Sequence, residues 1–91
     1  EDEHDSEKYI AKQVDSHEYV LSARLEIDKV NDLFGLGLPE SDEYMTVGGF
    51  ILHEYQSFPK LNEVVTIGHF EFRIIKSTMT KIELVRLKVK E

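Results

Sequence analysis

The chain has 91 residues, a formal net charge of −7 and no cysteine. This length suits one domain and is too short for two, because a single water-excluding core already uses most of so small a chain. The absence of cysteine excludes disulfide bonds and suits a reducing compartment. Nucleic acid is a disfavoured partner, since Asp and Glu outnumber Lys and Arg by 18 to 11.

The ends of the sequence and its apolar runs bear on domain organisation. Residues 1–8 are almost wholly charged and hold nothing apolar to bury, so we expect a solvated linker there and one folded domain over residues 9–90. The longest apolar run, Val47 to Leu52, is interrupted by glycines and is far shorter than the roughly 20 residues that cross a bilayer. We therefore expect no membrane insertion by these residues. Position 1 is Glu and no leader pattern follows, so we interpret the sequence as part of a longer polypeptide.

The first half of the folded part predicts a β-hairpin and then a short helix. Tyr9–Val14 and Glu18–Leu25 are typical strand segments separated by a short turn, and the second alternates apolar with polar residues. Over Ile27–Phe34 the apolar residues recur at helical spacing, and Gly35 is placed to end the helix. Residues 36–45 hold turn formers without a sustained period, which predicts a loop.

A second helix is predicted to begin after Thr46, a good N-cap, and to run until Pro59. Gly48 and Gly49 in its first turn cost about 1 kcal/mol each relative to Ala. We expect this cost to be offset by the close approach of another backbone. The glycines could also offer N–H groups to a phosphate, but the Lys and the Ser or Thr of a P-loop are missing, which favours tight packing.

The remaining residues predict three strands. Val64–Ile67 is followed by a turn at Gly68, and His69–Lys76 then alternates apolar with charged residues. After a turn over Ser77–Thr80 comes a last strand. Its apolar residues occupy even positions at first (Ile82 and Leu84) and odd positions afterwards (Val85, Leu87 and Val89). We interpret this change as a central strand carrying a β-bulge.

The order ββ-αα-βββ predicts an α+β fold. We expect a two-layer sandwich in which two helices cover one face of a mainly antiparallel sheet. The residues expected to be structural in this packing are Gly48, Gly49, Phe50, Pro59 and Gly68.

At this point the sequence resembles a known family, the CorC/HlyC transporter-associated domain. The resemblance is carried, in chain order, by Tyr19–Asp28, Gly35–Pro39, Thr46–Leu52, Phe58–Lys60 and Ile67–Phe72. It covers about Tyr9 to Lys90. Asn62 stands where the family usually has glycine, a mild departure because Asn tolerates the left-handed conformation.

The resemblance implies a parent protein and a place in it. The parent has a membrane region, then two CBS motifs, then this domain on the cytoplasmic face of the membrane, in proteins associated with magnesium and cobalt efflux or called hemolysins. Residues 1–8 are then the linker from the CBS pair, and residues 9–90 are the transporter-associated domain. The implied partners are the CBS domains and membrane region of the same polypeptide, or a second copy in a homodimer. The implied fold is similar to a flavin-binding subdomain, but without a flavin site.

We therefore expect a non-catalytic domain that modulates transport or assembly. No catalytic residue and no cofactor is predicted, because the sequence has no Cys nucleophile and no recognisable Ser-His-Asp order, and His53 lacks the second His four residues later that a helical zinc site needs. The alternative is a sensor that binds a nucleotide or divalent cation directly. Its candidate cation ligands are the loop carboxylates Glu40, Asp42 and Glu43.

The loop between the two predicted helices also holds candidate interface residues. They are apolar side chains that a small domain does not necessarily bury: Leu36, Leu38, Tyr44 and Met45. Exposed apolar groups of this kind often mark a contact surface. A loop folded back on its own core is the equal alternative.

Overall fold

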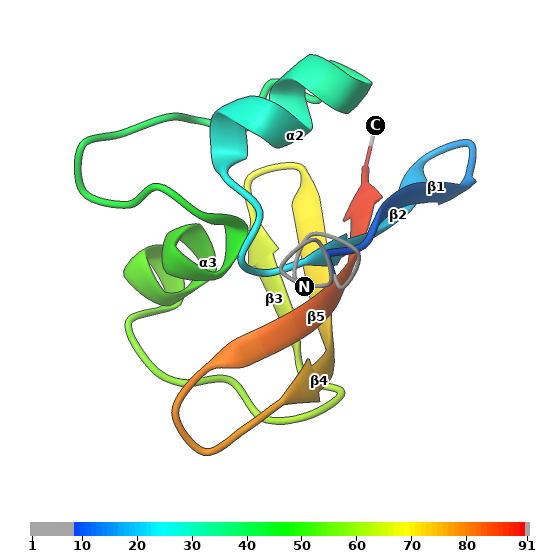
Figure 1. Ribbon diagram of the computed structural model, residues 1–91. Coiled ribbons are helices and arrows are strands. Elements are labelled where there is room, and N and C mark those ends of the chain that lie inside the picture. Colours follow the sequence, from blue (N-terminus) through cyan, green and yellow to red (C-terminus); the bar gives the residue numbers. More distant parts are fainter. Residues whose placement is uncertain (1–8, 91) are drawn as a thin grey trace, which may run out of the picture.

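The computed structural model describes residues 9–90, so the expected linker over residues 1–8 lies outside the described residues. Within them the elements follow the predicted order: β1 (Ala11–Asp15), β2 (Glu18–Ser22), α2 (Ile27–Phe34), α3 (Val47–Tyr55), β3 (Val64–Ile67), β4 (Phe70–Ser77) and β5 (Ile82–Val89). All strand pairs are antiparallel. The α+β fold expected from the sequence is confirmed (Figure 1).

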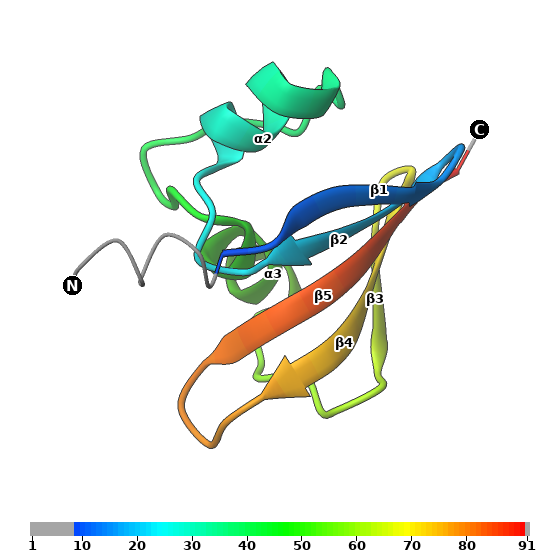
Figure 2. The same cartoon turned by 45° about the vertical axis from the view of Figure 1, so that its right-hand side comes forward.

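The five strands form one sheet in the order β1-β2-β5-β4-β3. The strand β5 lies in the middle, as predicted, and pairs with both β2 and β4. It therefore joins the β1–β2 hairpin to the β3–β4 hairpin, and Figure 2 shows it between them. No helix among residues 9–90 has the length and apolar character needed to cross a membrane.

The core lies between one face of the sheet and the two helices. The ring of Phe34 in α2 lies 4.8 Å from that of Tyr19 in β2, and the ring of Phe50 in α3 meets Phe72 in β4 edge-on at 5.9 Å. Tyr19 and Phe72 both pair with Leu87 of β5, so they share one face of the sheet. We call this the covered face, and the opposite one the uncovered face.

The predicted β-bulge is present and is shared between two strands. Between Ile74 and Ser77 the register of β4 against β5 shifts twice. The first shift leaves an extra residue in β4 and the second an extra residue in β5. As a result Ile82 and Val85 of β5 are both buried, although their sequence parity differs. A regular strand would have turned one of them to the uncovered face.

The caps explain where the helices begin and end. Gly35 ends α2 in a left-handed conformation at φ 64°, and the hydroxyl of Thr46 accepts the N–H of Gly49 at 3.1 Å at the start of α3. The predicted continuation of this helix to Pro59 is wrong, because α3 ends at Tyr55 and Gln56 is left-handed at φ 60°. A proline disfavours the helical conformation of the residue before it, so the apolar spacing of Phe58 was misleading.

The close approach expected at the glycine pair is seen at Gly48. Its N–H donates to the carbonyl of Ala23 at 2.9 Å, and a Cβ built there would lie 3.1 Å from the Cβ of Ala23. Gly48 therefore brings α3 against the chain that leaves β2. Further along, Pro59 is fully buried, and Gly68 is left-handed at φ 60° in the turn between β3 and β4.

Candidate functional site

The loop between α2 and α3 folds back onto the core. Leu38 is only 3% exposed, and Leu36 and Tyr44 are half-buried against the core. The hydroxyl of Tyr44 donates to the carbonyl of Pro39 at 3.0 Å, and its ring lies 5.1 Å from that of Phe50. Of the four interface candidates, Met45 is the one that projects into solvent, with 69% of its surface exposed.

Asn31 holds this loop in place. Its side-chain amide donates to the carbonyl of Leu38 at 2.9 Å, and its side-chain oxygen accepts the N–H of Leu38 at 2.8 Å. The two bonds satisfy the backbone N–H and carbonyl of Leu38, which lies outside any helix or strand. Sequence reasoning missed this role. The available signal was a polar residue at a core-facing position of α2.

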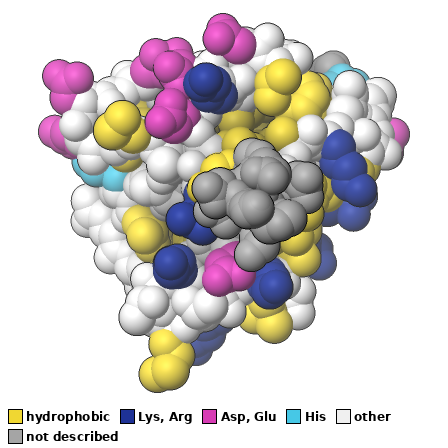
Figure 3. Space-filling model, viewed as in Figure 1, with side chains coloured by type: hydrophobic (Ala, Val, Ile, Leu, Met, Phe, Trp, Pro, Cys, Tyr) yellow, Lys and Arg dark blue, Asp and Glu magenta, His cyan; other side chains and the backbone are white. Residues whose placement is uncertain are grey.

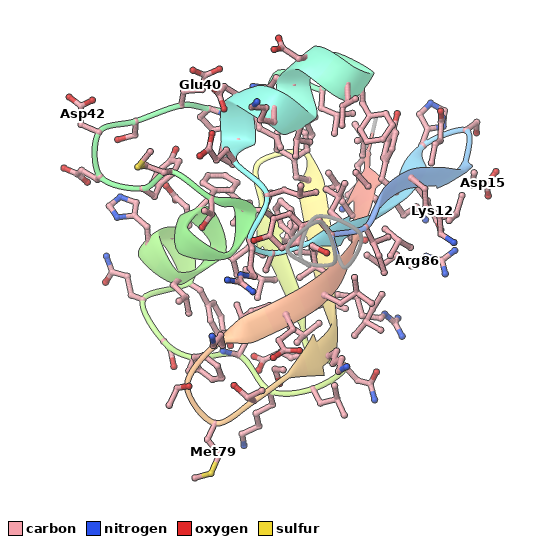
Figure 4. All side chains as sticks on the ribbon, in the orientation of Figure 1. Lys12, Asp15, Glu40, Asp42, Met79 and Arg86 are labelled. Carbon is pink, nitrogen blue, oxygen red and sulfur yellow. The ribbon has the colours of Figure 1, made fainter. Side chains whose placement is uncertain are left out.

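The three candidate cation ligands do not converge. The Oε1 of Glu43 lies 3.1 Å from the Nε2 of His53, whereas a carboxylate oxygen of Glu40 lies 3.4 Å from the side-chain nitrogen of Asn31. Figure 4 shows Glu40 and Asp42 at separate points of the exposed loop. Within residues 9–90 no group of three or more His, Asp or Glu side chains is arranged to hold a metal ion. The described residues give the predicted ligands no common centre.

Tyr44 sits among acidic groups at the base of this loop. Partial burial raises the pKa of its hydroxyl, and the carboxylates of Glu54 and Glu43 raise it further. The protonated hydroxyl donates its hydrogen bond to the carbonyl of Pro39. Its ring lies 5.4 Å from that of His53. These contacts make Tyr44 a loop anchor.

A second polar cluster joins the end of α3 to the start of β3. The carboxylate of Glu63 accepts the backbone N–H of Lys60 at 2.8 Å and the hydroxyl of Tyr55. The first of these bonds, and then the second, hold the pKa of Glu63 below its ordinary value. The same carboxylate raises the pKa of Tyr55. The cluster fixes the connection that α3 makes with the sheet edge.

Charged side chains are unevenly distributed over the molecule (Figure 3). In Figure 3, most Asp and Glu side chains lie at the upper left and top, over α2 and the following loop, and most Lys and Arg side chains lie below and to the right. Figure 4 shows Lys12 and Arg86 on the side opposite Glu40 and Asp42. Lys12 and Arg86 lie on the uncovered face of the sheet. This face contains a shallow hollow of about 340 Å³ lined by Glu18, Val64, Glu71, Arg73, Arg86 and Lys88.

Comparison with known proteins identifies relatives of the whole domain. Residues 12–91 match the CorC_HlyC family, described as the transporter associated domain. Hemolysin C of Brachyspira hyodysenteriae is 33% identical over 90 residues, which are 96% of this chain and 34% of that protein. The magnesium and cobalt efflux protein CorC of Salmonella typhimurium is 27% identical over 90 residues, or 98% of this chain and 30% of that protein.

A solved structure shares the fold. The transporter associated domain of a CBS domain protein from Porphyromonas gingivalis superposes with a TM-score of 0.74 at 20% identity, over 89% of this chain and 98% of that one. The chain spans about a third of the length of the two curated relatives.

Proposed function

Because the chain belongs to the CorC/HlyC family of transporter associated domains, we propose that it is a non-catalytic regulatory and interaction domain of a longer transporter polypeptide. In this proposal residues 9–90 are the domain, and residues 1–8 link it to a preceding CBS pair. It lies on the cytoplasmic face of the membrane and acts on the CBS domains and membrane region of the same polypeptide. The parent moves magnesium or cobalt ions, as the name of one relative suggests.

One observation carries the proposal: the buried apolar side chains of the described residues form a single core. The fully buried set is Phe50, Phe72, Leu21, Ile51, Ile74, Leu87, Val30, Val47, Val85 and Pro59. The hollow on the uncovered face is shallow and lined mostly by charged groups. Ligand pockets are usually concave and mostly apolar, so this surface suits contact with another protein segment better than enclosure of a substrate.

Deletion in the parent protein tests the proposal. We expect removal of residues 9–90 to change ion efflux, or its response to ion concentration, while membrane insertion stays intact. Met79→Ala is a matched control, since Met79 is 96% exposed at the turn between β4 and β5. Unchanged efflux, regulation and assembly after the deletion would remove the proposal.

The side of the membrane can be tested separately. The chain has no cysteine, so Met79→Cys places a single thiol in the domain at a fully exposed turn (Figure 4). With any other thiols of the parent replaced, we expect a membrane-impermeant maleimide to label inside-out vesicles and not right-side-out vesicles. The reverse pattern contradicts a cytoplasmic position. Labelling of both samples after detergent treatment controls for reactivity of the thiol.

The alternative, a direct nucleotide or cation sensor, was suggested by the glycine pair and the acidic loop. The N–H of Gly48 donates to Ala23 and that of Gly49 to Thr46, so both donors are already used. Calorimetry of the chain with Mg²⁺, Co²⁺ and adenine nucleotides separates the two functions. Heat of binding in the range of cellular concentrations supports the sensor, and none is expected for the interaction domain.

A further inference from the structure

The register of the sheet gathers cations on the uncovered face. Arg73 of β4 is directly opposite Arg86 of β5. Lys88, two residues after Arg86 in β5, lies on the same face. Lys12 of β1 pairs with Val20 of β2, which in turn pairs with Arg86, so Lys12 lies on this face as well. The four basic side chains are exposed, although the chain as a whole carries a net charge of −7. The face therefore differs in sign from the rest of the molecule.

This arrangement does not stabilise the domain by itself. Like charges directly opposite on neighbouring strands repel each other. Arg86 is compensated by Glu18, whose Oε1 accepts its Nε–H at 2.8 Å. Among residues 9–90, however, none forms a salt bridge with Arg73, Lys88 or Lys12. An anionic partner would relieve the repulsion and use the free cations.

The two carboxylates of the hollow restrict the shape of such a partner. Glu18 is held by Arg86, and Glu71 by Lys90 at 3.3 Å. They repel a compact, doubly charged anion at the centre of the hollow, whereas an extended chain can place separate carboxylates beside the free cations. Arg73 of β4 and Lys88 of β5 are diagonal neighbours on adjacent strands, about 7–8 Å apart. Carboxylates at alternate positions of an extended peptide are about 6.7 Å apart, which is a similar spacing.

We propose that the uncovered face docks an extended acidic peptide that carries a carboxylate at every second residue. Arg73 and Lys88 bind two of these carboxylates, and Arg86 supports the site while it remains paired with Glu18. The inference rests on the proposed function as an interaction domain and specifies the chemistry of its partner. Charge complementarity with a basic face on an acidic domain is the argument for this occupant.

Fluorescence anisotropy of the 91-residue chain with a labelled alternating Glu-Thr peptide tests the proposal. We expect binding at low salt that weakens as salt is added. The same peptide with Gln in place of Glu should not bind. The variant Arg73→Gln with Lys88→Gln should bind about tenfold more weakly, since it removes the two cations of the hollow that have no salt bridge within residues 9–90.

The matched control is Lys29→Gln with Lys60→Gln, which changes the net charge equally but replaces exposed cations of α2 and of the segment before β3. It should bind as the unmodified chain does. Circular dichroism checks that both variants are folded. Equal weakening in the two variants, or no peptide binding at all, overturns the proposal. So does tighter binding of inorganic phosphate, oligothymidylate or phosphatidylserine vesicles. None of these outcomes decides the deletion experiment in the parent, so the two hypotheses can fail separately.

Discussion

The two faces of the sheet differ in what their side chains contribute. Phe72 and Arg73 are neighbours in β4, yet they face opposite ways. Phe72 is fully buried and meets Phe50 edge-on, whereas Arg73 lies in solvent opposite another arginine. The covered face gains stability at each position, and the uncovered face includes a repulsive pair. Stability is thus concentrated on one face, which leaves the other free to serve binding.

The largest effect is expected for Phe72→Ala. Truncation of a fully buried phenylalanine removes its packing against Phe50 and leaves a cavity, which typically costs about 3–5 kcal/mol. Urea unfolding followed by circular dichroism measures the loss. Phe58→Ala is the control, because Phe58 is 38% exposed and its replacement should cost about 1 kcal/mol or less. Equal losses would mean that the core does not depend on the covered face.

A smaller loss is expected for Gly48→Ala. The new Cβ would lie 3.1 Å from the Cβ of Ala23 and 3.3 Å from its carbonyl oxygen. We expect a net loss of about 1–2 kcal/mol, because the overpacking exceeds the gain in helix propensity. Gly49→Ala would place its Cβ 3.3 Å from the hydroxyl of Thr46 and 3.4 Å from the Cβ of Tyr44, which are looser contacts than those at Gly48, so it should cost less. A gain in stability for Gly48→Ala would show that α3 can shift away from Ala23.

Removal of a charge from the uncovered face should raise the free energy of unfolding, whereas the substitutions above lower it. We expect Arg73→Gln to raise the free energy of unfolding by up to about 0.5 kcal/mol, because it removes the like charge opposite Arg86. The gain should shrink as salt is added. Urea unfolding at low and high salt measures it, with Lys29→Gln as the exposed control. A loss of stability would mean that Arg73 supports the fold and is not reserved for a partner.

The smallest effect concerns pH and the exposed Glu63 cluster. The folded-state pKa of Glu63 is lowered by its bonds from Lys60 and Tyr55, so ionised Glu63 stabilises the fold. That contribution is present above its unfolded pKa and is lost as pH falls through the folded value. Glu63→Gln should therefore be less stable than the unmodified chain at pH 7, and the difference should close in acid. Thermal unfolding across this range measures it, and a constant difference would contradict the assignment.

Local signals in the sequence predicted most of the fold. Gly35 and Thr46 marked helix boundaries because their roles depend on neighbouring backbone alone. The parity change in the last strand predicted both its central place and the bulge. The end of α3 was missed, since the apolar spacing continued to Phe58 while Gln56 had already left the helix. Apolar spacing indicates burial, and burial continues beyond the helix.

The candidate surface was harder to predict than the fold. Sequence reasoning could not place Arg73 opposite Arg86, because that contact depends on the register between β4 and β5. For the loop candidate Leu38, the sequence suggested an exposed interface where the structure shows burial. Leu38 is apolar and lies in a loop, which suggested an interface, but Asn31 holds it against the core. Both outcomes depend on contacts between different elements, which the pattern within one element does not encode.

The central place of β5 has a consequence for synthesis on the ribosome. The strand that joins the two hairpins is the last of the described strands to leave the exit tunnel, whatever residues follow it. Until then the earlier segments have no middle partner, and their apolar side chains stay open to chaperones. The domain should therefore acquire its native structure in one step, after β5 has left the tunnel. Any domain translated earlier in the same polypeptide has had time to fold by then.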